Sequence, residues 1–172
     1  MNHRIPCCGF LFTEKEHSRK INAEKLNEYQ IPVNAIADIK EGKDFIYQGR
    51  KISNAELTMD PIAPRRYAFC SDTLFNEKLI PTLSGVDLLY HEATFMNEAA
   101  DRAVQTFHST TLQAATIAQK AQVKNLLIGH FSAKYIDLEL MLEEARTIFS
   151  RTQLAIEGEK FSVTSNVLQP TI

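Results

Sequence analysis

Length, composition and charge suit one globular domain and exclude several other classes. The chain has 172 residues, of which 44% are hydrophobic and 23% charged, the balance of an ordinary globular protein. The formal net charge of −2 gives no compositional sign of nucleic-acid binding. No stretch is apolar enough for a transmembrane helix, and the first residues lack the build of a secretory signal. The three cysteines (Cys7, Cys8 and Cys70) make a poor disulfide framework, so we expect a reducing cytoplasm.

The first part of the chain predicts a strand, a charged segment and a hairpin. Asn22 is suited to cap a short helix that Ile31-Pro32 would end. By its charge density alone, the segment that holds this helix is typical of a solvated insertion. The expected elements are a strand over 3–12, the charged segment over 13–44 with its helix to about Tyr29, and a hairpin over 45–52 with Gly49 near its turn.

The rest of the chain alternates short apolar strands with amphipathic helices. We expect strands at 66–70, 86–90, 126–128, 152–156 and 159–163. We expect helices at about 75–80, from Ser109 as N-cap to 121, and over 138–149. This alternation predicts an α/β layered architecture.

Five polar clusters occur in order along the chain, and three of them end apolar runs. They are His3, Cys-Ser-Asp-Thr at 70–73, His-Glu-Ala-Thr at 91–94, His-Ser-Thr at 108–110 and Gly-His-Phe at 129–131. Polar side chains on loops held by a rigid sheet are the usual arrangement of a catalytic site, and these types suit a metallohydrolase.

His3, Asp72 and His130 are candidate metal ligands. Histidine nitrogen and aspartate oxygen suit zinc and similar ions, and one aspartate can bridge two ions that clamp a phosphoryl group. A sandwich that aligns the strand ends would bring the three together. Taken singly, each histidine is more often a structural or surface residue.

The remaining polar residues have alternative interpretations. Glu92 could orient His108 as a proton donor to an alkoxide leaving group, although His108 could also be an exposed loop residue. Lys134 and Tyr135 could hold a phosphate or a base, with surface placement as the default. Cys70 lies in an apolar strand, which favours an inert core thiol over a nucleophile.

Taken together, the ordered clusters resemble the ribonuclease Z family, tRNA 3′-processing endonucleases of the metallo-β-lactamase superfamily. The quoted motifs are His-Arg-Ile-Pro-Cys-Cys-Gly-Phe at 3–10, Cys-Ser-Asp-Thr at 70–73, Leu-Leu-Tyr-His-Glu-Ala-Thr-Phe at 88–95, His-Ser-Thr at 108–110 and Leu-Ile-Gly-His-Phe-Ser at 127–132. The pairing of His-Glu-Ala-Thr with His-Ser-Thr points to this family over its relatives.

The resemblance implies an αββα sandwich, two zinc ions per complete site, precursor tRNA as substrate and a homodimer for the complete enzyme. His3 and His130 would each bind one zinc, and Asp72 would bridge both. Glu92 and His108 would assist protonation of the leaving group. Residues 13–44 would be the flexible arm that grips the tRNA elbow in this family. Lys134 stands where the family commonly has arginine and would contact a substrate phosphate as a point charge.

The sequence departs from the family in ways that affect function. The motif His-x-His-x-Asp-His, which supplies most zinc ligands and the general base, is absent. We therefore expect residues 1–172 to be the C-terminal half of one domain, with an incomplete ligand set, a missing N-terminal half and no activity alone. The arm lacks the family's Gly-Pro tip and is not strongly basic.

Two alternative functions stay open. One is a phosphodiesterase of the same superfamily that acts on small substrates. The other is a non-catalytic module that binds RNA or another protein. Half a sandwich would expose an apolar sheet face, so self-association is a further expectation.

Overall fold

The computed structural model describes residues 1–163 and divides the chain into two compact units. The first unit consists of residues 1–13 together with the chain from Arg65 onward, and the second is Glu14–Pro64. None of the helices in residues 1–163 has the length and apolar character that a membrane crossing requires.

The first unit is built on a five-stranded sheet in the order β1-β6-β7-β8-β9. The strands are β1 (Phe10–Thr13), β6 (Arg66–Cys70), β7 (Leu88–Glu92), β8 (Leu126–Gly129) and β9 (Thr152–Leu154). β1 runs antiparallel to β6, while β6, β7, β8 and β9 are parallel to one another. Because Cys70 pairs with His91 and Glu92 pairs with Gly129, the chain leaves β6, β7 and β8 at the same edge of the sheet.

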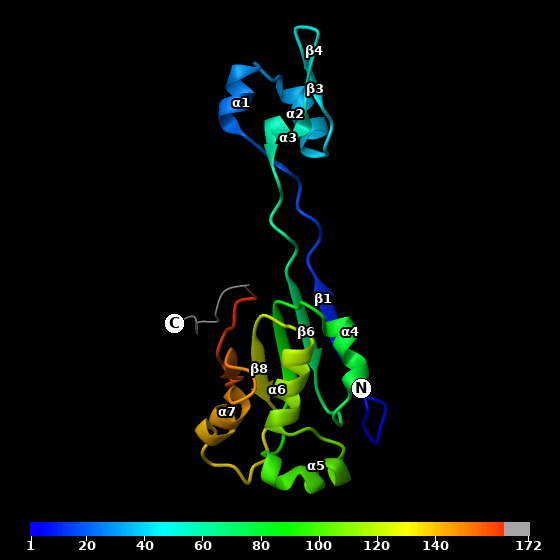
Figure 1. Ribbon diagram of the computed structural model, residues 1–172, viewed down its shortest axis with the longest axis vertical. Helices are drawn as coiled ribbons and strands as arrows, with labels where there is room; N and C mark the ends of the chain where they lie inside the picture. Colours follow the sequence, from blue (N-terminus) through cyan, green and yellow to red (C-terminus); the bar gives the residue numbers. More distant parts are fainter. Residues whose placement is uncertain (164–172) are drawn as a thin grey trace. The chain divides into compact units, whose positions relative to one another are not determined.

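Helices pack against one face of this sheet (Figure 1). They are η1 (Glu77–Leu79), α4 (Ile80–Leu83), η2 (Asn97–Ala99), α5 (Ala100–Thr106), α6 (Thr111–Lys120) and α7 (Glu139–Arg146). Leu83 of α4, Ile117 of α6 and Ala145 of α7 join Leu89 and Ile128 of the sheet in one buried cluster. These small and branched apolar side chains form the core that fixes the strand ends.

The other face of the sheet is aromatic and partly open. Leu88 and Leu127 are buried there beneath a few partly buried residues. Phe10 and Phe12 on β1 are both 57% exposed, and Phe12 stacks on Tyr67 with ring centroids 5.9 Å apart. The exposed apolar face that the sequence predicts is therefore present at the β1 edge.

The second unit has its own small apolar core. Its elements are β2 (Lys20–Ile21), α1 (Ala23–Glu28), α2 (Val33–Lys40), β3 (Phe45–Tyr47), β4 (Arg50–Ile52), α3 (Asn54–Leu57) and β5 (Thr58–Met59) (Figure 1). Ile31, Ile39, Ile52 and Leu57 are buried against one another. The unit extends past the predicted arm, 13–44, because the hairpin packs into this same core. We refer to Glu14–Pro64 as the arm unit below.

Several predicted elements are confirmed. The Asn22 side chain accepts a hydrogen bond from the Glu24 amide at the start of α1, as an N-cap does. The hairpin turns at Gly49, which has φ +79°. Strand 66–70 has the predicted bounds.

Other predicted boundaries were wrong. Residues 3–9 are not strand, and the predicted strand begins only at Phe10. No strand forms over 159–163, and the strand predicted at 86–90 lies at Leu88–Glu92. The helix predicted at 75–80 extends to Leu83, because Pro81 lies in the first turn of α4, where its missing amide hydrogen has no helical partner to lose. The N-cap of α6 is Thr110 in a capping box with Gln113, not Ser109.

Candidate metal and catalytic site

Asp72, His108 and His130 come together at the edge where the parallel strands end. Each offers one ligand atom, and these atoms all lie within 4.8 Å of one another. Asp72 follows β6, His130 follows β8, and His108 precedes α6. The shared edge of β6 and β8 therefore explains how residues so distant in sequence meet.

The backbone at this edge is held in unusual conformations. Asp72, Phe107 and His130 have φ values of 52°, 63° and 63°, in the left-handed region that side chains other than glycine rarely adopt. A Cβ on Gly129 would come within 2.6 Å of the Tyr90 hydroxyl oxygen, so glycine fits before His130. Such strain persists where the surrounding structure fixes it, and it is concentrated at functional sites.

Two histidine–carboxylate pairs define the site. Nε2 of His130 lies 3.2 Å from Oδ1 of Asp72, and both side chains are more than one third exposed. Nδ1 of His108 lies 2.9 Å from Oε1 of Glu92, whose side chain is fully buried. The structure thus brings together both members of each pair, one open to solvent and one set in the core.

Glu92 holds three segments of the site together. Its Oε1 accepts hydrogen bonds from the Thr73 and Ser109 amides, at 3.0 and 3.1 Å, in addition to His108. Its Oε2 accepts from the amide and the hydroxyl of Thr94, at 3.1 and 2.8 Å. A buried carboxylate requires such partners, and here they come from the loops after β6 and β7 and from the turn before α6.

Thr94 connects the two pairs. Its Oγ1 lies 2.9 Å from Nδ1 of His130 as well as 2.8 Å from Oε2 of Glu92. A continuous polar chain therefore runs from His108 through Glu92 and Thr94 to His130. Sequence reasoning gave Thr94 no role, although the residue lies within the His-Glu-Ala-Thr motif.

His3 lies beside the site but outside the group of three. Its ring centroid is 5.5 Å from that of His108 and 6.1 Å from that of Phe107. A cavity of about 320 Å³ adjoins these rings and is lined by His3, Arg4, Gln105, Thr106, Phe107 and His108. The structure therefore places His3 next to the predicted proton donor, while its role as a metal ligand stays a prediction.

Lys134 lies on the loop after His130. Its Nζ is 3.5 Å from Oε1 of Glu98 and 4.4 Å from the ring centroid of Tyr135. A hydrogen bond to Tyr135 raises the pKa of Lys134, which keeps the ammonium charged. The predicted contact with a substrate phosphate would use this exposed charge.

Cys70 and His91 lie in the core next to the site. Burial raises the pKa of the Cys70 thiol to about 11, so it stays protonated, as an inert core thiol does. Burial lowers the pKa of His91, which is fully buried, so its ring stays neutral. The neutral His91 ring bonds through Nδ1 to the Glu92 carbonyl oxygen at 2.7 Å.

The donor set fits a divalent metal ion. One aspartate oxygen and histidine nitrogens are ligands that zinc prefers. Oδ1 of Asp72 and Nε2 of His130 both carry lone pairs and face each other at 3.2 Å, an arrangement that a cation between them would stabilise. These donor types also suit other transition-metal ions.

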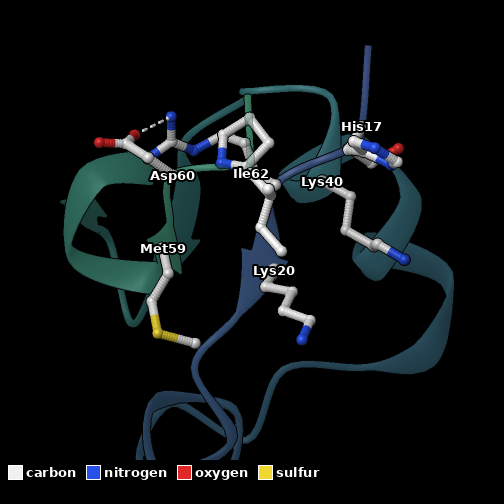
Figure 2. A pocket seen from close by; sticks show the side chains of 9 residues that line it. His17, Lys20, Lys40, Met59, Asp60 and Ile62 are labelled. Carbon is white, nitrogen blue, oxygen red and sulfur yellow. Dashed lines mark ion pairs between the residues drawn. The ribbon is translucent and has the colours of Figure 1, made fainter. Parts of the chain in front are cut away.

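A basic pocket lies within the arm unit, as Figure 2 shows. Its volume is about 550 Å³, and it is lined by His17, Ser18, Arg19, Lys20, Lys40, Met59, Asp60, Pro61 and Ile62. Arg19 is bound at 2.7 Å to Asp60. Lys20 and Lys40 are exposed and form no ion pair within residues 1–163. The pocket therefore offers two uncompensated cations.

Comparisons with known proteins agree with this geometry. No family model matches the chain. A curated protein named ribonuclease Z from Parabacteroides distasonis is 53% identical over 164 residues, which are 95% of this chain and 54% of that protein. A second ribonuclease Z, from Bacteroides fragilis, is 48% identical over 92% of this chain and 52% of that protein. The chain thus spans about half the length of the curated relatives it matches.

A solved structure supports the fold. The metallo-β-lactamase fold protein YhfI from Bacillus subtilis aligns with a TM-score of 0.51 and 25% identity over 55% of this chain and 38% of that chain. The predicted α/β class and metallo-β-lactamase type of fold are confirmed. The resemblance seen in the ordered motifs is confirmed as well: over nearly its whole length, this chain is similar in sequence to about half of a ribonuclease Z.

Proposed function

We propose that this chain supplies the leaving-group side and part of the metal site of a zinc-dependent endoribonuclease that removes the 3′ trailer from precursor tRNA. The observation that carries the proposal is the Glu92–His108 pair beside Asp72 and His130, in a chain about 50% identical to proteins named ribonuclease Z. The His-x-His-x-Asp-His motif is absent from these 172 residues. The complete activity therefore requires the half of a ribonuclease Z that this chain does not match.

Asp72 and His130 would hold metal, with His3 as a further ligand. Bound zinc supplies activation of water at neutral pH and stabilisation of charge on the phosphoryl oxygens. Asp72 and His130 present the two lone pairs that such an ion needs. The left-handed backbone at both residues fixes the direction of these donors before substrate arrives.

His108 would protonate the leaving oxygen. The Glu92 carboxylate accepts the Nδ1 proton of His108, so the exchangeable site of the ring is Nε2. The core-anchored carboxylate restricts the ring orientation and favours the imidazolium that donates. Substitution of His108 in a complete enzyme should therefore lower kcat for precursor tRNA far more than it raises KM.

The arm unit would bind RNA through its basic pocket. Lys20 and Lys40 present uncompensated charge at this pocket, and phosphate contacts by lysine supply affinity that falls with salt. This local concentration of charge favours an RNA contact that the nearly neutral composition of the segment did not indicate. The homodimer and the cytoplasmic location implied by the resemblance are part of this same proposal.

The arm variants also separate the two enzymatic alternatives. In a complete enzyme, Lys20→Glu with Lys40→Glu should raise KM for precursor tRNA about tenfold or more and reduce the salt dependence of binding by about two ions. Cleavage of a small aryl phosphodiester should be unchanged. Lys43→Glu is the control, since Lys43 is paired with Asp38 at 2.8 Å. Unchanged tRNA cleavage in the double variant would favour the phosphodiesterase of small substrates.

The exposed aromatic edge favours a second candidate, a non-catalytic binding module. Phe10 and Phe12 are both more than half exposed on a strand of the sheet. Light scattering of the purified chain tests this candidate. A stable monomer that stays soluble at high concentration would count against a face built for protein contact, whereas defined self-association would support it.

A further inference from the structure

Thr94 occupies a position between the two carboxylate–histidine pairs. It is 6% exposed and lies directly after Glu92-Ala93, which are fully buried. Its hydroxyl oxygen is within hydrogen-bond distance of Oε2 of Glu92, at 2.8 Å, and of Nδ1 of His130, at 2.9 Å. A hydroxyl has one proton to donate, so its choice of acceptor determines which partner must donate back.

The buried carboxylate determines that choice. Oε2 of Glu92 has the Thr94 amide and hydroxyl as its partners, so loss of the hydroxyl proton would leave a buried charge less well satisfied. When Thr94 donates to Glu92, its remaining lone pair faces Nδ1 of His130. His130 must then donate from Nδ1, and in the neutral ring Nε2 is left with a lone pair.

We propose that Thr94 is a positioning residue that holds His130 as the Nδ1–H tautomer and keeps its Nε2 lone pair directed at the cation site beside Asp72. Its value to metal binding rests on the proposed function. The tautomer itself is a property of the metal-free chain. A bond from the non-ligating nitrogen to a carboxylate, here relayed by a hydroxyl, fixes the ring and raises the basicity of the ligating nitrogen.

A competing arrangement makes the proposal testable. His130 could instead donate from Nε2 to Asp72, with the Thr94 hydroxyl turned toward Nδ1. That contact is longer, at 3.2 Å, and joins side chains that are 44% and 38% exposed. The Thr94–Glu92 contact is shorter and buried, where a hydrogen bond is less weakened by water. Removal of the hydroxyl should therefore allow the Asp72 arrangement to take over.

The experiment is two-bond ¹H–¹⁵N NMR of the ¹⁵N-labelled 172-residue chain without metal at pH 9, where imidazoles are neutral. The His130 signals are those lost in His130→Gln. We expect the wild type and Thr94→Ser to show protonated Nδ1, and Thr94→Val, which keeps the shape without the hydroxyl, to show protonated Nε2. Thr116→Val is the control for the substitution type, since the Thr116 hydroxyl bonds within its own helix to Leu112.

Protonated Nε2 in the wild type, or an unchanged tautomer in Thr94→Val, would overturn the proposal. If Thr94→Val does not fold, the wild-type tautomer alone still decides. As a second measurement, Zn²⁺ affinity by calorimetry should fall about tenfold or more in Thr94→Val and be recovered in Thr94→Ser. The tautomer does not depend on RNA cleavage, so failure of this proposal and failure of the endoribonuclease proposal are distinguishable.

Discussion

Replacement of Glu92 by glutamine tests the buried hydrogen-bond network most severely. Glu92 accepts hydrogen bonds at both oxygens, from three backbone amides, the Thr94 hydroxyl and His108. Glutamine has nearly the same shape but offers one acceptor oxygen and one NH₂ donor. The better orientation keeps oxygen at the position of Oε1, where more donors converge, and turns the NH₂ toward Thr94.

The magnitude follows from the partners lost. The Thr94 hydroxyl can turn and accept from the new NH₂, but the Thr94 amide cannot, so one buried donor is orphaned at a cost of about 1–3 kcal/mol. The bonds that remain lose their charge assistance, which contributes roughly 1 kcal/mol more per strong bond. We therefore expect the free energy of unfolding to fall by about 2–5 kcal/mol, a large part of the stability of a small domain.

Urea denaturation followed by circular dichroism measures this loss. For an m value near 2 kcal/mol per molar, the midpoint should fall by about 1–2 M with m unchanged. Glu143→Gln is the matched control, since Glu143 is exposed on α7 and its midpoint should stay within about 0.5 kcal/mol of wild type. Equal midpoints for Glu92→Gln and wild type would refute the description of Glu92 as the buried acceptor of this network.

Three further predictions concern the surroundings of the site. Burial lowers the pKa of His91 below its ordinary 6.5, so the unfolded chain binds the proton first as pH falls. Its stabilisation is thus complete above pH 6.5 and is lost at lower pH by up to about 1.4 kcal/mol per pH unit, a slope that urea titrations should find reduced in His91→Gln. Gly129→Ala should destabilise by about 1–3 kcal/mol in thermal unfolding, because the new methyl meets the Tyr90 ring; an unchanged Tm would contradict that contact. Thr110→Ala should cost about 1 kcal/mol by loss of the capping box at α6, whereas Ser109→Ala at the position first predicted as the cap should act through its bond to the Thr73 carbonyl.

The site could be predicted from sequence where polar residues end apolar strands. Asp72 and His130 follow β6 and β8, and the parallel order of these strands brings them to one edge. Glu92 was predicted to need a partner because it follows a buried strand, and His108 provides one. These inferences depend on strand ends, which local composition determines well.

The rest depends on tertiary contacts that no local pattern encodes. The role of Thr94 exists only because the loop after β7 meets the loop after β8. Ser109 was mistaken for a cap because serine and threonine are both good N-caps, and only the buried Thr73 carbonyl decides between them. Local composition also ended the predicted arm at 44, whereas the structure's second compact unit continues to Pro64.

The most direct test of the central claim combines this chain with the half of a ribonuclease Z that it does not match, as a fusion or as separate fragments. Cleavage of precursor tRNA at the 3′ trailer is then measured with and without a chelator. The account predicts no cleavage by this chain alone, metal-dependent cleavage by the assembly, and loss of that cleavage in His130→Ala. A folded, metal-loaded assembly that does not cleave, or one that cleaves equally well with His130→Ala, would contradict it.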